Sequence, residues 1–252
     1  MPLINKVKYI FMLGLIISMS VYAQANFKTY SIDSNSQTIS FEFTKNRKLS
    51  LEKNMVPRGS AVLTTSGQLK KDGIKGIIHA ATGSMNSSDT NFSPNLEGIK
   101  NSIKNSLIIA KKNKISSLAF PFLGSGIFLT SIGVSRNILA REILDTIIKN
   151  HENPSSLMIK LVAYSKEDLG IFKKEFEVLT KENPELVKRI EILEGSITDY
   201  SLHKSEVIVN AANTELVFGG GISGHIGSKT KEANSINLQC RKLIDKLKSE
   251  TK

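Results

Sequence analysis

The chain has 252 residues, of which 40% are hydrophobic, 23% charged and 6% aromatic, and its formal net charge at pH 7 is +11. This composition is that of a globular protein with one sizeable core, and it excludes wholesale disorder and a body embedded in a membrane. The positive charge favours anionic partners such as phosphates, nucleic acid or acidic surfaces. Because the lysines are spread through helical segments and form no compact stripe with aromatics, a solvated basic face is the simpler interpretation of the charge.

The N-terminus has the pattern of a secretory signal peptide. Residues 1–8 carry two lysines and no acid, residues 9–21 are almost wholly apolar, and residues 21–23 offer a small-residue cleavage site. The apolar run is shorter than the roughly 20 residues that span a bilayer, which favours cleavage over an uncleaved anchor. We therefore predict that residues 1–23 are removed and that the protein is exported, to the periplasm or the medium. Loss of Lys6 and Lys8 lowers the formal charge from +11 to +9.

Strands and helices are predicted to alternate along the rest of the chain. Apolar residues at helical spacing predict helices within residues 96–107, 138–148, 169–179 and 236–247, and residues 84–95 are predicted to be a loop. Apolar runs between turn signals predict strands at residues 38–43, 60–64, 74–80, 118–123, 157–164, 190–193 and 207–209. This order predicts an α/β fold, a three-layer α/β/α sandwich with a mixed, largely parallel sheet. Such sheets bind ligands beyond the carboxyl ends of their strands.

The most informative segment follows the last predicted strand. Asn210 and Asn213 end that strand, and three glycines, Gly219, Gly220 and Gly221, precede the next helix. Glycines between a strand end and a helix start leave backbone N–H groups free to face an anion, and no Cβ blocks its approach. The segment therefore indicates a phosphate site, with a flexible turn as the plainer interpretation of three glycines alone.

These residues carry a resemblance to a known family. The sequence IVNAAN (residues 208–213), followed by GGGISGHI (residues 219–226), resembles the signature of the macrodomain family, in which the asparagine pair and glycine loop hold the distal ribose and a phosphate of ADP-ribose. LEGSIT (residues 193–198) resembles the opening strand of the same family. The glycine loop is nearer to the viral-type subgroup. The resemblance implies the macrodomain fold.

The C-terminal half of the family's pattern lies earlier in the chain. GSAVLT (residues 59–64) and IIH (residues 77–79) resemble the middle strands of the family, and AFPFLGSGIF (residues 119–128) resembles its second phosphate loop. The resemblance thus covers residues 59–178 as the family's C-terminal half and residues 190–252 as its N-terminal half. Either one circularly permuted domain spans residues 59–252, or two half-domains are completed by other copies of the chain. We expect the permuted, monomeric form, because a lone half would expose unpaired strand edges.

The resemblance also implies a site. It implies that Asn213 holds the distal ribose or a water, that Phe128 packs on that ribose, and that Tyr164 packs on the adenosine portion. Asn213 and Ser223 are the catalytic candidates, and neither a metal nor a cofactor is implied. The residues implied in ligand binding are Asn210, Gly219, Gly220, Gly221, Ile222, Gly124, Ser125, Gly126, Ile127, Phe128, Tyr164, Ser196 and Ile197.

Three residues depart from the family's pattern. Ser196 replaces the Asp that accepts a hydrogen bond from the adenine amino group in many members, and Leu129 replaces a common glycine at the end of the second loop. Ser223 stands where one hydrolase subgroup has an Asp proposed as the catalytic base, so the mechanism of that subgroup does not transfer as usually drawn. In viral-type members, with a small residue there, the substrate's own phosphate and a bound water are thought to share the work.

Three functions therefore stay open. The first is removal of mono-ADP-ribose from proteins, or hydrolysis of a related ADP-ribose derivative, and the second is a reader that binds ADP-ribose without turnover. The third, which the positive charge permits, is a module that binds poly-ADP-ribose or nucleic acid. His225 is a candidate general base, but an ordinary helix residue is the simpler interpretation, and His79 is expected to close the core or a loop hydrogen bond. Cys240 is interpreted as a small buried hydrophobe, and residues 24–58 as an N-terminal extension with an extra strand or a tether.

Overall fold

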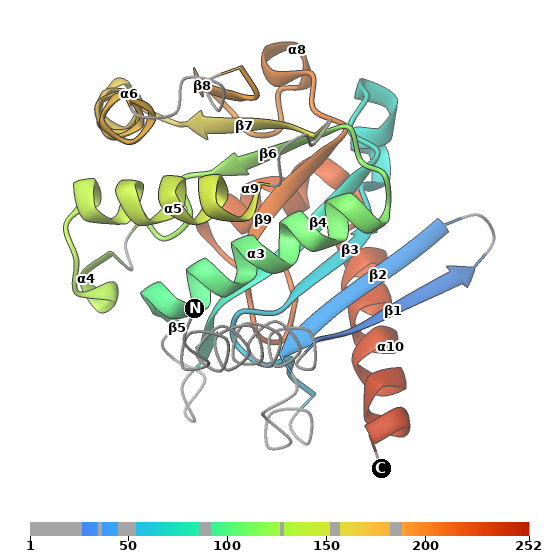
Figure 1. Cartoon of the computed structure of the whole chain (residues 1–252). Coiled ribbons are helices and arrows are strands. Elements are labelled where there is room, and N and C mark those ends of the chain that lie inside the picture. The colour runs from blue at the N-terminus through green and yellow to red at the C-terminus, as the bar shows by residue number, and fades with distance from the viewer. Residues whose placement is uncertain are drawn as a thin grey trace, which may run out of the picture.

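The computed structural model describes residues 27–34, 37–44, 54–85, 92–126, 129–151, 157–181 and 188–251 (Figure 1). The predicted signal peptide, residues 1–23, lies outside these residues. Within the described ranges, no helix combines the length and apolar character needed to cross a bilayer.

One mixed sheet of nine strands runs through the described part of the chain, in the order β1-β2-β3-β4-β9-β6-β7-β8, with β5 paired to β4. The strands are β1 (Phe27–Ser34), β2 (Gln37–Thr44), β3 (Ala61–Thr65), β4 (Gly76–Met85), β5 (Phe92–Pro94), β6 (Ser117–Pro121), β7 (Met158–Ala163), β8 (Ile190–Glu194) and β9 (Val207–Asn213). Strands β4, β9, β6, β7 and β8 pair in parallel, whereas β1, β2, β3 and β5 pair antiparallel. The predicted α/β class and mixed sheet are confirmed, and the parallel part is confined to five strands.

The prediction of a loop at residues 84–95 was wrong at both ends. Strand β4 continues to Met85, and its last residues pair with β5, so that Gly83 lies opposite Pro94 and Met85 opposite Phe92. Thr82, Gly83 and Ser84 have the composition of a turn, but Gly83 and Ser84 pair with β5, which keeps this part of the strand extended.

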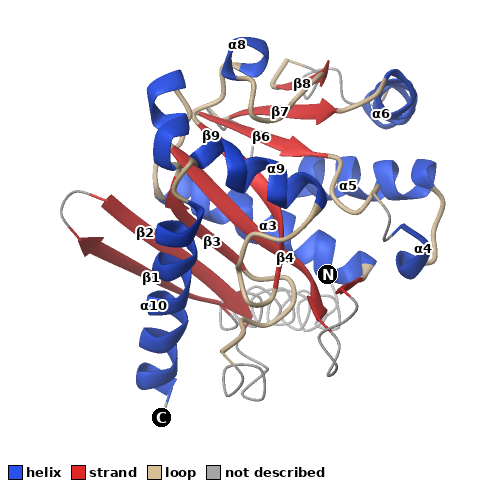
Figure 2. Cartoon of the chain, turned by 180° about the vertical axis from the view of Figure 1, so that it is seen from behind, coloured by secondary structure: helices blue, strands red, loops and turns tan. Residues whose placement is uncertain are grey.

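Helices cover both faces of the sheet. Helices α3 and α5 lie in front of the sheet in Figure 1, and α9 and α10 lie in front of it when it is seen from behind in Figure 2. The helices are η1 (Gly67–Asp72, a 3-10 helix), α3 (Leu96–Lys112), α4 (Leu129–Ile132), α5 (Arg136–Asn150), α6 (Lys166–Thr180), α8 (Tyr200–His203), α9 (Gly221–Thr230) and α10 (Ala233–Thr251). Asn95, Ser135 and Ser165 begin α3, α5 and α6, and each side chain accepts a backbone N–H three residues on, which satisfies one of the free donors of the first turn.

Strand β9 lies at the centre of the core. Val207 and Val209 are buried in the cluster that packs under α3, α5 and α6, while Ile208 is buried in the cluster on the opposite face. Alternate residues of a strand point to opposite faces, so an unbroken apolar run is what a strand buried on both sides requires. Because β9 pairs with both β4 and β6, the last part of the chain completes a sheet that earlier residues begin.

Val56, near the start of the buried core, packs against the last helix, α10. The Val56 N–H donates to the carbonyl of Thr214 at 2.8 Å, and Val56 packs in one buried cluster with Cys240, Leu243 and Ile244 of α10. Cys240 is a buried small hydrophobe, as expected, and burial raises the pKa of its thiol to about 12. It is therefore an inert thiol at physiological pH.

Candidate functional site

The loops that carry the predicted site residues leave one edge of the sheet. The carboxyl ends of parallel strands meet at a common edge, and β9, β6, β7 and β8 are neighbours there in that order. The turn of Gly219–Gly221 follows β9, the turn of Gly124–Gly126 follows β6, Tyr164 follows β7, and Ser196 follows β8. The fold thus brings segments more than 90 residues apart in sequence to one edge.

A buried hydrogen-bond chain supports the first glycine turn from within the core. Asn210 is fully buried, and its Nδ2 donates to Nδ1 of His79 at 3.3 Å and to Oγ of Ser223 at 3.2 Å. Oγ of Ser223 also accepts the backbone N–H of Gly219 at 3.3 Å. Asn210 and Ser223 therefore tie the start of the glycine turn to the centre of the sheet.

His79 lies at the other end of this chain of hydrogen bonds. The Thr64 hydroxyl donates to the carbonyl of Thr65 at 3.0 Å and lies 2.9 Å from Nε2 of His79, so the network assigns the proton to Nε2 and leaves Nδ1 as the acceptor for Asn210. Burial lowers the pKa of His79 to about 3. The imidazole is therefore neutral at every physiological pH. This confirms the expectation that His79 has a structural role.

The glycine turn itself is open on its outer side. A Cβ on Gly219, Gly220 or Gly221 would meet no atom within 4 Å, and Gly221 has a φ of +58°, a left-handed conformation that favours glycine. Gly220 caps α9 without any side-chain hydrogen bond, so the first N–H groups of α9 face outward with the positive end of the helix dipole. Gly224 packs inward, because a Cβ there would lie 2.4 Å from the carbonyl oxygen of Gly219.

The second glycine turn is held from beneath. Gly124 has a φ of +82°, and a Cβ there would lie 2.7 Å from Ile132 Cδ1 and 2.8 Å from Ile99 Cδ1. The backbone N–H and the hydroxyl of Ser125 both donate to the carbonyl of Phe122. Arg136 donates to the carbonyl of Ser125 and pairs with Asp168 at 3.0 Å, which fixes the turn against α6. Ile127 and Phe128 lie outside the described residues.

The remaining predicted residues lie around these turns. Oδ1 of Asn213 accepts the backbone N–H of Val217 at 3.3 Å, so this side chain shapes the segment between β9 and the glycines. Ile222 is partly buried against the core on the α9 side of the sheet, and Ile197 is buried in that core. Tyr164 is 82% exposed at the end of β7, with its ring free to receive a partner.

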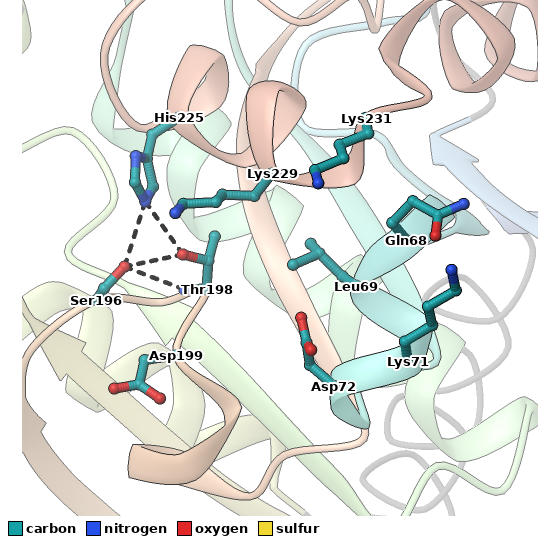
Figure 3. Close-up of a pocket in the computed structure, with 10 residues that line it drawn as sticks. All are labelled: Gln68, Leu69, Lys71, Asp72, Ser196, Thr198, Asp199, His225, Lys229 and Lys231. Carbon is teal, nitrogen blue, oxygen red and sulfur yellow. Dashed lines mark hydrogen bonds between the residues drawn. The ribbon is translucent and has the colours of Figure 1, made fainter.

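Ser196 contacts Thr198 and His225, a meeting that the sequence did not indicate. Its Oγ lies 3.0 Å from Oγ1 of Thr198 and 3.4 Å from Nε2 of His225, and the same Nε2 lies 3.1 Å from Oγ1 of Thr198. His225 was interpreted as an ordinary helix residue, but the fold brings it from α9 to the loop after β8. Two hydroxyls and an imidazole thus form one wall of a cavity of about 540 Å³ (Figure 3).

The opposite walls of this cavity come from η1 and the end of α9, with Leu69 and Lys71 on the first and Lys229 and Lys231 on the second. Ser196 is the only predicted site residue that lines it. No periodicity or motif links these segments, so sequence analysis missed the cavity. No group of three or more His, Cys, Asp or Glu side chains suited to a metal ion occurs in the described ranges.

Part of the chain is similar in sequence to known proteins. The sequence profile of the Macro domain matches residues 40–139. An uncharacterized protein of Aquifex aeolicus is 35% identical over 102 residues, which are 39% of this chain and 53% of that protein. An uncharacterized protein of Thermoplasma volcanium is 48% identical over 54 residues, 21% of this chain and 26% of that protein. The chain thus spans about half the length, or less, of these relatives.

Solved structures of the Oceanobacillus iheyensis macrodomain are also similar. A mutant form is 26% identical with a TM-score of 0.40, over 50% of this chain and 62% of that one. The same macrodomain with ADP is 26% identical with a TM-score of 0.39, over 50% of this chain and 61% of that one. The residues that match the Macro domain profile, 40–139, include the second glycine turn and strands β3, β4, β5 and β6 of the mixed sheet.

Proposed function

We propose that this protein binds ADP-ribose between its two glycine turns. The observation that carries the proposal is the pair of glycine turns at the ends of adjacent parallel strands. The first of these turns is open on its outer side and begins α9 without a side-chain cap. Free N–H groups at a helix start and a left-handed glycine turn bind the oxygens of a pyrophosphate without any cation. The Macro domain match over residues 40–139 supports ADP-ribose as the ligand that supplies this pyrophosphate.

We also propose that one circularly permuted domain forms the site. The sequence IVNAAN of β9 lies outside the matched residues, yet β9 pairs with β4 and β6, which lie within them. In this proposal a single chain supplies both glycine turns, and the protein acts as a monomer. The contact of Val56 with Leu243 and Ile244 brings the two ends of the domain together, as a permutation requires.

The first experiment is calorimetric titration with ADP-ribose. We expect micromolar binding by the wild type and its loss in Gly220→Glu, because the carboxylate fills the phosphate position with bulk and like charge. Gly170→Glu on α6 is the matched control, since a Cβ at either glycine meets no atom within 4 Å and neither has a left-handed φ. Equal affinity in the two variants, with both folded, contradicts binding at the glycine turn.

We further propose that the bound ADP-ribosyl group is hydrolysed from proteins or from a related derivative. Asn213 is the last residue of β9, ahead of the glycine turn, where its carboxamide nitrogen can orient a ribose or a water. Holding substrate and water in attack geometry contributes a large part of a rate by itself. Asn213→Ala is expected to abolish release of ADP-ribose from mono-ADP-ribosylated protein while the thermal unfolding midpoint stays near that of the wild type.

One observation favours the alternative of a reader without turnover. Ser223 is buried, and its oxygen accepts hydrogen bonds from Asn210 and from Gly219, so it is engaged in holding the turn. A role for Ser223 in positioning the turn therefore competes with a role in catalysis. Tight ADP-ribose binding with no release from a modified protein would identify the reader. Binding of poly-ADP-ribose or nucleic acid through the basic face would instead weaken steeply with salt.

We propose in addition that the protein is exported. The pattern of residues 1–23 supports this, and it predicts a mature chain that begins at Gln24. The measurement is N-terminal sequencing of protein recovered from the periplasm or medium. An uncleaved chain confined to the cytoplasm of the producing cell contradicts the proposal.

A further inference from the structure

The cavity beside α9 is separate from the glycine turns. None of the residues of the two turns lines it, and it is formed instead by η1, the loop after β8 and the second half of α9. Its volume of about 540 Å³ falls within the range of small-molecule sites, which is roughly 300–1,000 Å³. The cavity is therefore large enough for a ligand of its own.

Three lysine ammonium groups surround this cavity. His225 and Lys229 lie four residues apart on one face of α9, and Lys231 follows at the end of the helix with a left-handed φ of +52°. Lys71 approaches from η1 on the other side (Figure 3). Across the described ranges, Lys71, Lys229 and Lys231 have no ion-pair partner within 4.0 Å, so their charges are not neutralised locally.

The other lining groups suit a ligand that carries a phosphate on a small organic body. Thr198 and Ser196 present hydroxyl groups next to His225, and the buried Leu69 provides an apolar surface. Two carboxylates are present, but that of Asp199 accepts the N–H and the hydroxyl of Ser201. Asp72 is left as an acceptor for a donor group of the ligand. The cavity as a whole is cationic.

We infer that this cavity is a second anion site, which binds a phosphate-bearing small molecule through Lys71, Lys229 and Lys231. The phosphate belongs either to a separate ligand or to an extension of the ligand held by the glycine turns. This inference does not depend on the identity of the ligand at the glycine turns. Ammonium groups without an ion-pair partner bind phosphate oxygens by charge-assisted hydrogen bonds, which are about twice as strong as neutral ones.

The test is calorimetric titration of the full chain with inorganic pyrophosphate in the Gly220→Glu background, which closes the glycine turn. We expect binding to persist in this background and to weaken by about tenfold or more when Lys229→Gln and Lys231→Gln are added, because two of three cations are lost. Lys173→Gln with Lys174→Gln on α6 is the matched control, since both lysines are exposed and the change in net charge is the same. All four lysines are on the surface, so the thermal unfolding midpoint should be unchanged.

The inference is overturned if pyrophosphate fails to bind the Gly220→Glu protein, or if the control pair weakens binding as much as the cavity pair. It is also overturned if the cavity pair leaves the affinity unchanged, which would mean that the lysines serve only the negative end of the α9 dipole. A second titration, of pyrophosphate into the wild type saturated with ADP-ribose, shows whether the phosphate belongs to a separate ligand or to an extension of the ligand at the glycine turns. Pyrophosphate that still binds indicates a separate ligand, whereas exclusion by ADP-ribose indicates one ligand that reaches both sites.

Discussion

Single buried residues link the first glycine turn to the core. Ser223 gives one oxygen to two donors, the side chain of the buried Asn210 and the backbone of Gly219. His79 holds the other hydrogen of the same carboxamide. A buried chain of this kind is costly to interrupt, because each member that loses its partner keeps the full cost of desolvation.

Replacement of Ser223 by Ala should loosen the turn. Asn210 and Gly219 would each lose an acceptor, and we expect a loss of about 1–3 kcal/mol of unfolding free energy together with weaker binding of ADP-ribose. Urea unfolding and calorimetry measure the two effects. Ser228→Ala on the exposed side of α9 serves as control, and equal behaviour of the two variants would mean that Ser223 does not support the turn.

The buried imidazole of His79 should make stability depend on pH. Burial lowers its pKa to about 3, whereas the unfolded side chain takes up a proton near pH 6.5. Between these values the unfolded chain binds the extra proton, so unfolding free energy should fall as pH falls, by up to about 1.4 kcal/mol per pH unit. Urea unfolding from pH 7.5 to 4 measures this slope, and His79→Gln should reduce it. Burial also lowers the pKa of His203, which adds to the slope in both proteins.

At the scale of the elements, α9 contributes to two sites, the first glycine turn and the cavity. Its first turn begins at Gly221 of the glycine segment, and its middle and last turn place His225 and Lys229 at the cavity. Gly224 lets the first turn of the helix close against Gly219, since a Cβ there would lie 2.4 Å from a backbone oxygen. Helix and turn therefore depend on one another at this glycine.

Two glycine-to-alanine substitutions in helices should change the stability of the protein in opposite directions. Gly170→Ala on α6 meets no atom and should raise stability by up to about 1 kcal/mol through helix propensity. Gly224→Ala gains the same propensity but forces the backbone of Gly219 to move, an overpacking cost of about 1–3 kcal/mol. Thermal unfolding should show a higher midpoint for the first variant and a lower one for the second. Similar shifts in both variants would mean that a Cβ next to the carbonyl of Gly219 does not lower the free energy of unfolding.

The glycine turns could be predicted from sequence because their signals are local. In IVNAAN and the glycines after it, strand, turn and helix start are adjacent in the chain, and each residue type has a direct physical meaning there. The cavity could not be predicted, because Lys71, Ser196 and Lys229 come from three distant segments whose meeting depends on the whole sheet. The strand β5 was missed for a similar reason, since only its pairing with β4 makes it extended.

At the scale of the molecule, the permutation that we propose changes the connectivity of the chain and not its packing. Strand β9 would occupy the same place between β4 and β6 in either order, because its contacts are set by the apolar residues on both of its faces. Because Val56 packs in one buried cluster with the middle of α10, a new connection would run between the last helix and the start of the core.

A chain with residues 188–252 placed first tests whether packing, and not connectivity, sets the position of β9. A protein in which residues 188–252 precede residues 24–181, joined by a flexible glycine and serine linker, should fold as a monomer and bind ADP-ribose with an affinity close to that of the wild type. Size-exclusion chromatography and calorimetry measure both properties. A reordered chain that folds only as a dimer would favour half-domains completed by a second copy.

The central position of β9 also has a consequence for biosynthesis. Until residue 213 has emerged, the sheet lacks its middle strand, and β4 and β6 each present an unpaired edge. Such edges associate readily with other chains, and pairings between residues far apart in sequence form slowly. The nascent protein must therefore stay unassembled until almost its whole length has been made. A chain that crosses a membrane before it folds needs this same delay.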